Sequence, residues 1–160
     1  MSRWAYVNGR YVPHREASVH VEDRGYQFAD GVYEVVLVHA GAMIDEIPHL
    51  DRLDRSLDEL RIDPPMGRMA LRAVLREVVR RNRIRTGLVY LQITRGVARR
   101  DHAFPTGVKP ALVVTAKRLN LPREETLESG VRVVTIEDIR WQRCDIKSVG
   151  LLPNVLGKQA

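Results

Sequence analysis

The feature that most constrains the fold is a change in the spacing of apolar residues along the chain. Residues 31–38 are rich in β-branched side chains and alternate like a strand, with Tyr33 on one face and Glu34 on the other. From residue 48 the apolar positions fall three or four residues apart, which is the spacing of a helix. The leucines on this helical stripe are Leu50, Leu53, Leu57 and Leu60. Strand and helix patterns that follow one another in this way indicate an α+β chain.

The rest of the chain repeats these two patterns. Asn8-Gly9 lies between β-favouring flanks and predicts a hairpin over residues 5–12, because the pair supplies the two positive-φ residues of a type I′ turn. The other expected elements are a turn at 40–41 with a partner strand at 42–44, a helix over 68–82, strands over 88–96, 110–116 and 131–136, and a helix over 151–159.

We therefore expect an α+β fold in two parts. An N-terminal mixed sheet with two helices occupies residues 1–119, and the incomplete start of a second, β-rich domain occupies residues 120–160. The boundary is placed at residues 119–125, which have the composition of a linker. A chain of 160 residues is long enough to bury a hydrophobic core.

Composition excludes several classes of protein. No apolar run approaches the roughly 18 residues that cross a bilayer, so no membrane association is expected, and the N-terminus lacks the apolar segment of a signal peptide. The single cysteine, Cys144, cannot form an intrachain disulfide, which agrees with a cytoplasmic location. The histidines and this cysteine include no pair at zinc-ligand spacing, so no metal site is expected. Nucleophile-elbow, Walker and G-x-G-x-x-G motifs are also missing from the sequence.

The chain is basic, with 26 Lys and Arg against 20 Asp and Glu and a net charge of +6. Four arginines, Arg72, Arg76, Arg80 and Arg83, recur along the expected helix over 68–82 and just past it. Such a stripe could track a phosphate backbone, as in a nucleic-acid-binding module. Because Glu77 interrupts it and no aromatic residue accompanies it, a solvated helix face is the preferred interpretation.

Lys147 is the first candidate for a chemical role. It lies between Ile146 and a short Ser-Val-Gly-Leu-Leu run, which places its stem in apolar surroundings. Desolvation penalises an ammonium ion, and a neutral amine can form a Schiff base. From the local sequence alone, a lysine that extends its charge into water is the more ordinary interpretation.

Three further residues carry similar alternatives. Arg100 and His102 lie two apart in a loop and could offer several donors to one carboxylate, or they could simply be solvated. Tyr33 could be a buried strand residue, and Arg52 could be a helix surface charge paired with Asp51 or Asp54. Residue chemistry alone does not decide between these interpretations.

Five motifs, taken together and in order, resemble the class IV pyridoxal-phosphate aminotransferases, and most closely their D-amino-acid-specific branch. The motifs are Tyr-Val-Asn-Gly at 6–9, Glu-Asp-Arg-Gly-Tyr-Gln-Phe-Ala-Asp-Gly-Val-Tyr-Glu at 22–34, His-Leu-Asp-Arg-Leu at 49–53, Gln-Ile-Thr-Arg-Gly at 92–96, and the segment 138–159. They cover nearly all of the chain.

The resemblance implies a role for each candidate residue. Lys147 matches the lysine that holds pyridoxal 5'-phosphate through a Schiff base and moves the proton at the substrate α-carbon. Arg52 matches the arginine that binds the cofactor phosphate. Tyr33, Arg100 and His102 match the trap for the substrate α-carboxylate in the D-specific branch, where the arginine and histidine come across a homodimer interface.

The implied reaction is transfer of an amino group from a D-amino acid, such as D-alanine, to a 2-oxo acid, such as 2-oxoglutarate. Branched-chain L-amino-acid aminotransferase and aminodeoxychorismate lyase are the alternatives within the family, and a basic nucleic-acid-binding module is the alternative outside it. The Arg100-x-His102 pair favours the D-specific branch.

The chain departs from the family pattern in two ways. Family members are much longer, and the glutamate that pairs with the pyridine nitrogen has no counterpart here, so we expect this chain to bind the cofactor weakly or not at all. Gly157 stands where alanine is usual, which should weaken its helix by up to about 1 kcal/mol.

Overall fold

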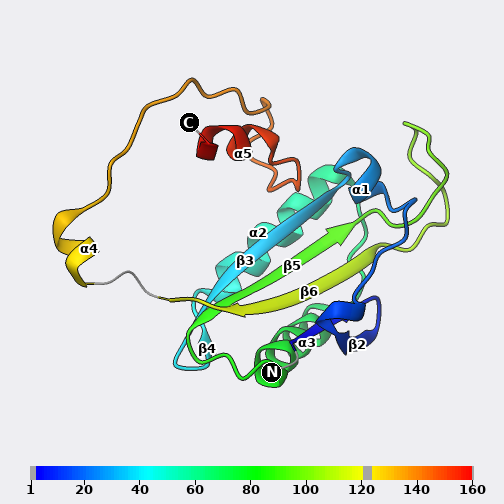
Figure 1. Cartoon of the computed structure of the whole chain (residues 1–160). Coiled ribbons are helices and arrows are strands. Elements are labelled where there is room, and N and C mark those ends of the chain that lie inside the picture. The colour runs from blue at the N-terminus through cyan, green and yellow to red at the C-terminus, as the bar shows by residue number, and fades with distance from the viewer. Residues whose placement is uncertain (1–2, 121–123, 160) are drawn as a thin grey trace.

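The structure is a computed structural model that describes residues 3–120 and 124–159 (Figure 1). Its centre is a six-stranded sheet in the order β2-β1-β6-β5-β3-β4. The strands are β1 Trp4–Val7, β2 Arg10–Pro13, β3 Gly31–His39, β4 Ala42–Met43, β5 Gly87–Thr94 and β6 Ala111–Arg118. The α+β class is confirmed by this arrangement.

The sheet is antiparallel at every described strand pair, so the expectation of a mixed sheet is wrong. The reason lies in the connection from β3 to β5, which contains two long helices, α2 Glu46–Leu60 and α3 Arg68–Arg81. One helix would carry the chain back for a parallel strand, whereas two in succession return it to the end where β3 finished. The backbone N–H of Gly41, just after β3, donates to the carbonyl of Arg85, just before β5, at 2.9 Å.

Helices α2 and α3 cover one face of the sheet, behind the strands as viewed in Figure 1. Their apolar stripes are buried as the leucine spacing predicts, and Leu50, Leu53, Leu57, Leu75 and Val78 are at most 1% exposed. The alternation predicted for β3 is also confirmed, because Glu34, Val36 and Val38 face this core and are fully buried. On the opposite face Tyr33 and Val35 are half-buried and Leu37 is exposed.

Most of the other expected elements are present. The hairpin turns at Asn8 and Gly9, with φ of 45° and 93°. Shorter helices are α1 Arg24–Phe28, the 3-10 helix η1 His14–Glu16, α4 Glu124–Ser129 and α5 Leu152–Gln159. No helix in the described chain is long and apolar enough to cross a membrane.

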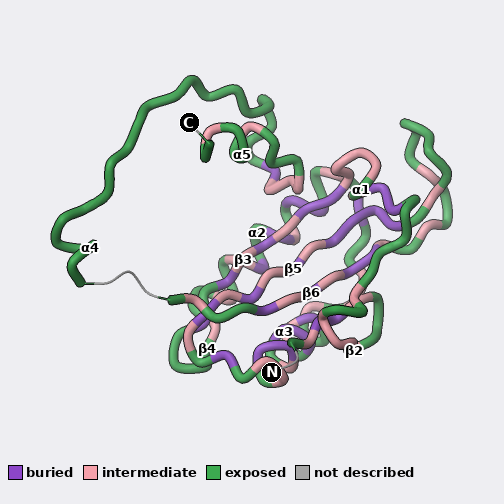
Figure 2. The backbone as a smooth tube through the Cα atoms, in the orientation of Figure 1, coloured by how far each residue is buried: buried purple, intermediate pink, exposed green. Residues whose placement is uncertain are grey.

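The strand predicted over 131–136 is wrong. These residues form no ladder, and the segment runs as an exposed arc between α4 and α5 (Figure 2). Val131, Val133 and Val134 are 68–84% exposed. A β-favouring sequence forms a strand only where a partner strand accepts its hydrogen bonds, and the described residues provide none here.

The C-terminal part of the chain contains the predicted helix. The helix expected over 151–159 is α5, and a Cβ added at Gly157 would collide with the Cδ1 atom of Ile136, so a glycine permits this close approach. The expected linker at 119–125 includes residues 121–123, which lie outside the described residues. The division of the chain into two domains stays a prediction.

Candidate active site

Lys147 is positioned by the main chain on either side of it. Its carbonyl accepts a hydrogen bond from the N–H of Tyr33 at 3.0 Å, and the N–H of Val149 donates to the carbonyl of Gly31 at 3.1 Å. Ser148 forms an antiparallel bridge with Val32 between these two bonds. The segment 147–149 therefore pairs with the first residues of β3, on the edge that faces away from β5.

Helix α2 anchors the same segment from a second direction. Ser56 Oγ accepts from the N–H of Lys147 at 3.3 Å, and Arg55 Nη2 donates to the carbonyl of Asp145 at 2.8 Å. Ile146 is only 4% exposed and belongs to the hydrophobic core. The expectation that Lys147 adjoins apolar surroundings is therefore met on its N-terminal side.

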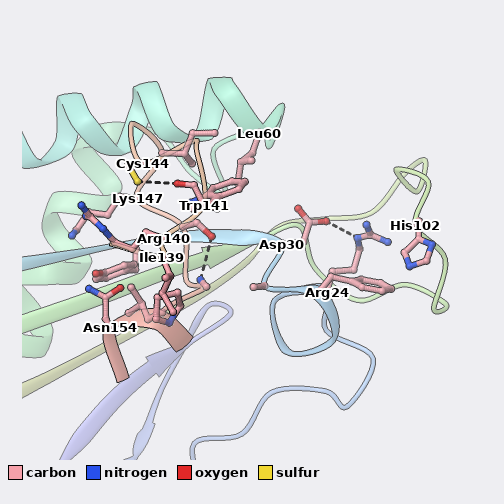
Figure 3. A pocket seen from close by; sticks show the side chains of 18 of the residues that line it. Arg24, Asp30, Leu60, His102, Ile139, Arg140, Trp141, Cys144, Lys147 and Asn154 are labelled. Atoms are coloured by element: carbon pink, nitrogen blue, oxygen red, sulfur yellow. Dashed lines mark hydrogen bonds and ion pairs between the residues drawn. The ribbon is translucent and has the colours of Figure 1, made fainter. Parts of the chain in front are cut away.

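The amine of Lys147 lies in a cavity of about 870 Å³ that Tyr33 and His102 also line. Its Nζ atom is 4.2 Å from the centroid of the Tyr33 ring, a cation–π distance. The Tyr33 ring stacks in turn on Tyr90, with centroids 5.6 Å apart. Figure 3 shows Lys147, Cys144 and Arg140 on one side of this cavity and Arg24 and His102 on the other.

Arg100 and His102 meet at one aromatic ring. The Arg100 guanidinium lies 4.6 Å from the centroid of Phe28, and the His102 ring lies 5.4 Å from it. Both residues are exposed, and Arg100 is not among the residues that line the cavity. The structure thus brings Tyr33, His102 and Lys147 to one cavity and holds Arg100 beside it.

Arg52 lies apart from this cavity, on α2. Its Nε and Nη2 atoms each donate to a carboxylate oxygen of Glu34 at 2.6 Å, and His49 Nδ1 is 2.8 Å from the same carboxylate. The hydrogen bonds to Glu34 raise the pKa of the Arg52 guanidinium above its ordinary value. Pairing with Asp51 or Asp54 is therefore wrong, because both aspartates bind Arg68 instead.

A buried charge cluster that the sequence did not reveal forms the floor beside His102. Asp30 accepts from Arg24 Nε at 2.6 Å and from Arg95 Nε and Nη2 at 2.8 and 3.0 Å. Burial raises the pKa of Asp30, but the hydrogen bonds from Arg95 and Arg24 outweigh it, and the pKa is lowered overall. Arg24 and Asp30 stand in the 22–34 motif and Arg95 in the 92–96 motif, but nothing in their spacing indicates that they form one cluster.

The cluster also fixes the walls of the cavity. Arg24 Nη1 donates to the carbonyl of Asp101 at 2.6 Å, one residue before His102. Arg95 donates to the carbonyl of Leu60 at the end of α2 and stacks 3.8 Å from the Phe104 ring centroid. Two guanidinium groups share one carboxylate, so this side of the cavity carries surplus positive charge and suits an anionic ligand.

The charge cluster gives a testable prediction for stability. Asp30→Asn leaves two buried arginines without their counter-charge and should lower the free energy of unfolding at neutral pH by about 3–5 kcal/mol. Because the pKa of Asp30 is lowered by folding, its stabilisation is present above the ordinary aspartate pKa of about 3.9 and is lost as the pH falls through the lowered value. Urea unfolding of both proteins from pH 7 to pH 3 should therefore show a difference that shrinks below about pH 4.

The exposed Asp63 provides a matched control for this measurement. Asp63→Asn makes the same chemical change where no buried partner is lost, and it should alter the free energy of unfolding by less than about 0.5 kcal/mol. Equal effects of the two substitutions would contradict the structural role of the cluster.

Comparison with known proteins identifies the family of this chain. The family model described as amino-transferase class IV matches residues 31–160. A D-alanine aminotransferase of Staphylococcus haemolyticus is 44% identical over 96% of this chain and 55% of its own length. One of Listeria monocytogenes is 46% identical over 95% of this chain and 53% of its own length. The chain thus spans about half the length of these relatives.

Solved structures give the same fold. The 4-amino-4-deoxychorismate lyase of Pseudomonas aeruginosa superposes with a TM-score of 0.74 at 24% identity, over 97% of this chain and 56% of that one. A branched-chain amino acid aminotransferase of Escherichia coli gives 0.70 at 20% identity, over 74% of this chain and 42% of that one. Since the family model covers most of the sequence and the fold matches, the chain belongs to the class IV aminotransferase family.

Proposed function

We propose that this chain carries the reactive lysine and part of the substrate site of a D-amino-acid aminotransferase, which transfers an amino group from a D-amino acid such as D-alanine to a 2-oxo acid such as 2-oxoglutarate. The observation that carries the proposal is the Lys147 amine, held 4.2 Å from the Tyr33 ring in a cavity that His102 also lines. The identity of 44–46% to D-alanine aminotransferases supports this branch of the family.

Class IV aminotransferases use pyridoxal 5'-phosphate, and the residues here suit part of that cofactor. A cavity of about 870 Å³ falls within the range of about 300–1,000 Å³ typical of small-molecule sites, and it presents a primary amine. When bound, the cofactor supplies an electron sink for negative charge at the substrate α-carbon. Lys147 would hold it covalently through Nζ.

By the family resemblance Arg52 would hold the cofactor phosphate, and it would do so from outside the cavity that Lys147 lines. The Nε and Nη2 atoms of Arg52 donate hydrogen bonds to Glu34, whereas its Nη1 atom has no hydrogen-bond partner among the described residues. Glu34 is fully buried, so it fixes the plane of a guanidinium whose side chain is 43% exposed. Because Glu34 already fixes the guanidinium of Arg52, its Nη1 donor could bind an anion with little further loss of side-chain entropy.

The other residues would orient the substrate and move its proton. Once the substrate amine has displaced it from the cofactor, the Lys147 amine would take the α-proton onto Nζ and return it. Tyr33 lies beneath that amine and would restrict where it can reach. Tyr33 would also bind the substrate α-carboxylate, together with Arg100 and His102 contributed across the homodimer interface that the family resemblance implies.

The assignment of Lys147 is tested by covalent labelling. The chain is incubated with pyridoxal 5'-phosphate, reduced with borohydride and mapped by peptide mass. We expect the adduct at Lys147, its loss in Lys147→Arg, and its retention in Lys158→Arg, which alters a lysine on the neighbouring helix α5. An adduct mainly at another lysine would overturn the assignment.

A titration followed by absorbance measures how tightly this chain binds pyridoxal 5'-phosphate. Because the chain spans about half of its relatives, we expect absorbance titration to show weak association that does not saturate at equal concentrations of protein and cofactor. Tight stoichiometric binding would show that these residues suffice for the site.

The substrate is tested in a chimaera, in which this chain replaces the matching residues of the Staphylococcus haemolyticus D-alanine aminotransferase. We expect D-alanine to be used at least tenfold faster than L-leucine with 2-oxoglutarate as acceptor. Arg100→Ala should raise KM for D-alanine by about 10–100-fold, the worth of a lost charge-assisted hydrogen bond of about 1.5–3 kcal/mol. Arg99→Ala, an exposed neighbour, is the matched control.

The chimaera also separates the alternatives. Faster reaction with L-leucine would favour a branched-chain aminotransferase, and elimination from aminodeoxychorismate without amino transfer would favour the lyase. Equal effects of Arg99→Ala and Arg100→Ala would remove Arg100 from the substrate site. A homodimer and a cytoplasmic location stay predictions of the same family assignment.

A further inference from the structure

A second cavity lies at the other end of β3 from Lys147, around β4 and the C-terminal end of α3 (Figure 1). Its volume is about 710 Å³. The charged residues that line it are Glu46, Arg76, Arg80, Arg83, Arg85 and Arg118. We call it the arginine cavity. Five guanidinium groups around one carboxylate make it strongly positive.

Existing ion pairs account for only part of this charge. Glu46 binds Arg72 at 2.8 Å and Arg76 at 3.1 Å, and Glu77 binds Arg80 at 2.7 Å. Within residues 3–120 and 124–159, Arg83, Arg85 and Arg118 have no salt-bridge partner. These three are the unpaired arginines of the cavity.

The unpaired arginines come from two places that the sheet register brings together, the connection from α3 to β5 and the end of β6. Arg83 follows α3, Arg85 precedes β5, and Arg118 ends β6 opposite Gly87 in the sheet register. The carbonyl of Arg85 accepts from Gly41 at 2.9 Å. The helix dipole explains basic residues in the last turn of α3, but it gives no reason for Arg85 or Arg118 to gather at the same concavity.

Arg83 lies in the left-handed conformation that ends α3. Its φ is 52°, and the N–H groups of Arg83 and Ile84 donate to the carbonyls of Arg80 and Val79 at 3.0 and 3.1 Å. Arg61 has the same conformation after α2, with φ of 53°. The helix end therefore explains this backbone conformation.

The volume and the lining residues of the arginine cavity indicate what kind of molecule would fit it. Its volume is that of a small-molecule site, and Val79 and Ile84, each 6% exposed, contribute apolar surface to it. Guanidinium forks bind phosphate oxygens bidentately. We propose that the arginine cavity binds a small molecule that carries two or more phosphate groups.

A nucleic acid suits these observations less well. Of the arginine stripe along α3, Arg72, Arg76 and Arg80 are already paired with Glu46 or Glu77. The unpaired arginines surround a hollow instead of following a line, so they do not match the regular phosphate spacing of a strand.

Calorimetric titration with inorganic tripolyphosphate tests the proposal on the 160-residue chain. We expect measurable binding that Arg83→Gln/Arg85→Gln/Arg118→Gln weakens by at least tenfold. The control is Arg10→Gln/Arg15→Gln/Arg132→Gln, which removes the same charge from exposed sites elsewhere and should change affinity by less than twofold. Arg52→Gln should also retain binding, which separates this site from the proposed cofactor-phosphate residue.

Three results would overturn the proposal: no binding to the unaltered chain at millimolar tripolyphosphate, equal loss in the two triple variants, or tighter binding of a single-stranded oligonucleotide that depends on the same arginines. Arg83→Gly guards against loss of fold, because glycine accepts a φ of 52° freely. It should keep the melting temperature of the unaltered chain and still weaken tripolyphosphate binding.

Discussion

The candidate site depends on the pairing of residues 147–149 with the start of β3. Two main-chain hydrogen bonds place Lys147 beside Tyr33, and the Ser56 and Arg55 side chains of α2 hold the same segment from a second direction. Alternation along β3 then sends Tyr33 to the open face of the sheet and Glu34 to the helix-covered face. One short stretch of strand therefore supports the Lys147 amine on one side and the Arg52 guanidinium on the other.

Buried carboxylates divide the arginines of this chain into two kinds. Glu34 and Asp30 each hold guanidinium groups at hydrogen-bond distance, and those arginines serve the architecture around the proposed active site. Removing either carboxylate would leave a buried or half-buried cation without compensation. The unpaired arginines at the far end of the sheet have no such partner among the described residues, which is why a basic chain can contain both a rigid site and an available anion site.

The sequence predicted those features of the fold that depend on interactions between residues close together in the chain. The Asn8-Gly9 turn, the alternation of β3 and the leucine stripe of α2 each depend on neighbours within a few residues, and the structure contains all three. The segment 131–136 has strand propensity, but no described strand pairs with it, so the strand predicted from that propensity does not form. Glu34 lies 18 residues from Arg52 and meets it because α2 packs on β3. Arg95 lies 65 residues from Asp30 and meets it through the register of β3 with β5. Arg52 and Lys147 were known as candidates from motif resemblance, while their surroundings were not.

The central claim is that pairing with β3 positions Lys147, and amide hydrogen exchange by NMR tests it most directly. The Tyr33 N–H donates to Lys147 and the Val149 N–H donates to Gly31, so both should exchange far more slowly than the exposed amides of residues 131–136. Tyr33 is the more telling of the two, because its N–H points away from β5 and has no other acceptor in the described sheet. Exchange of both amides at the rate of residues 131–136 would contradict the account.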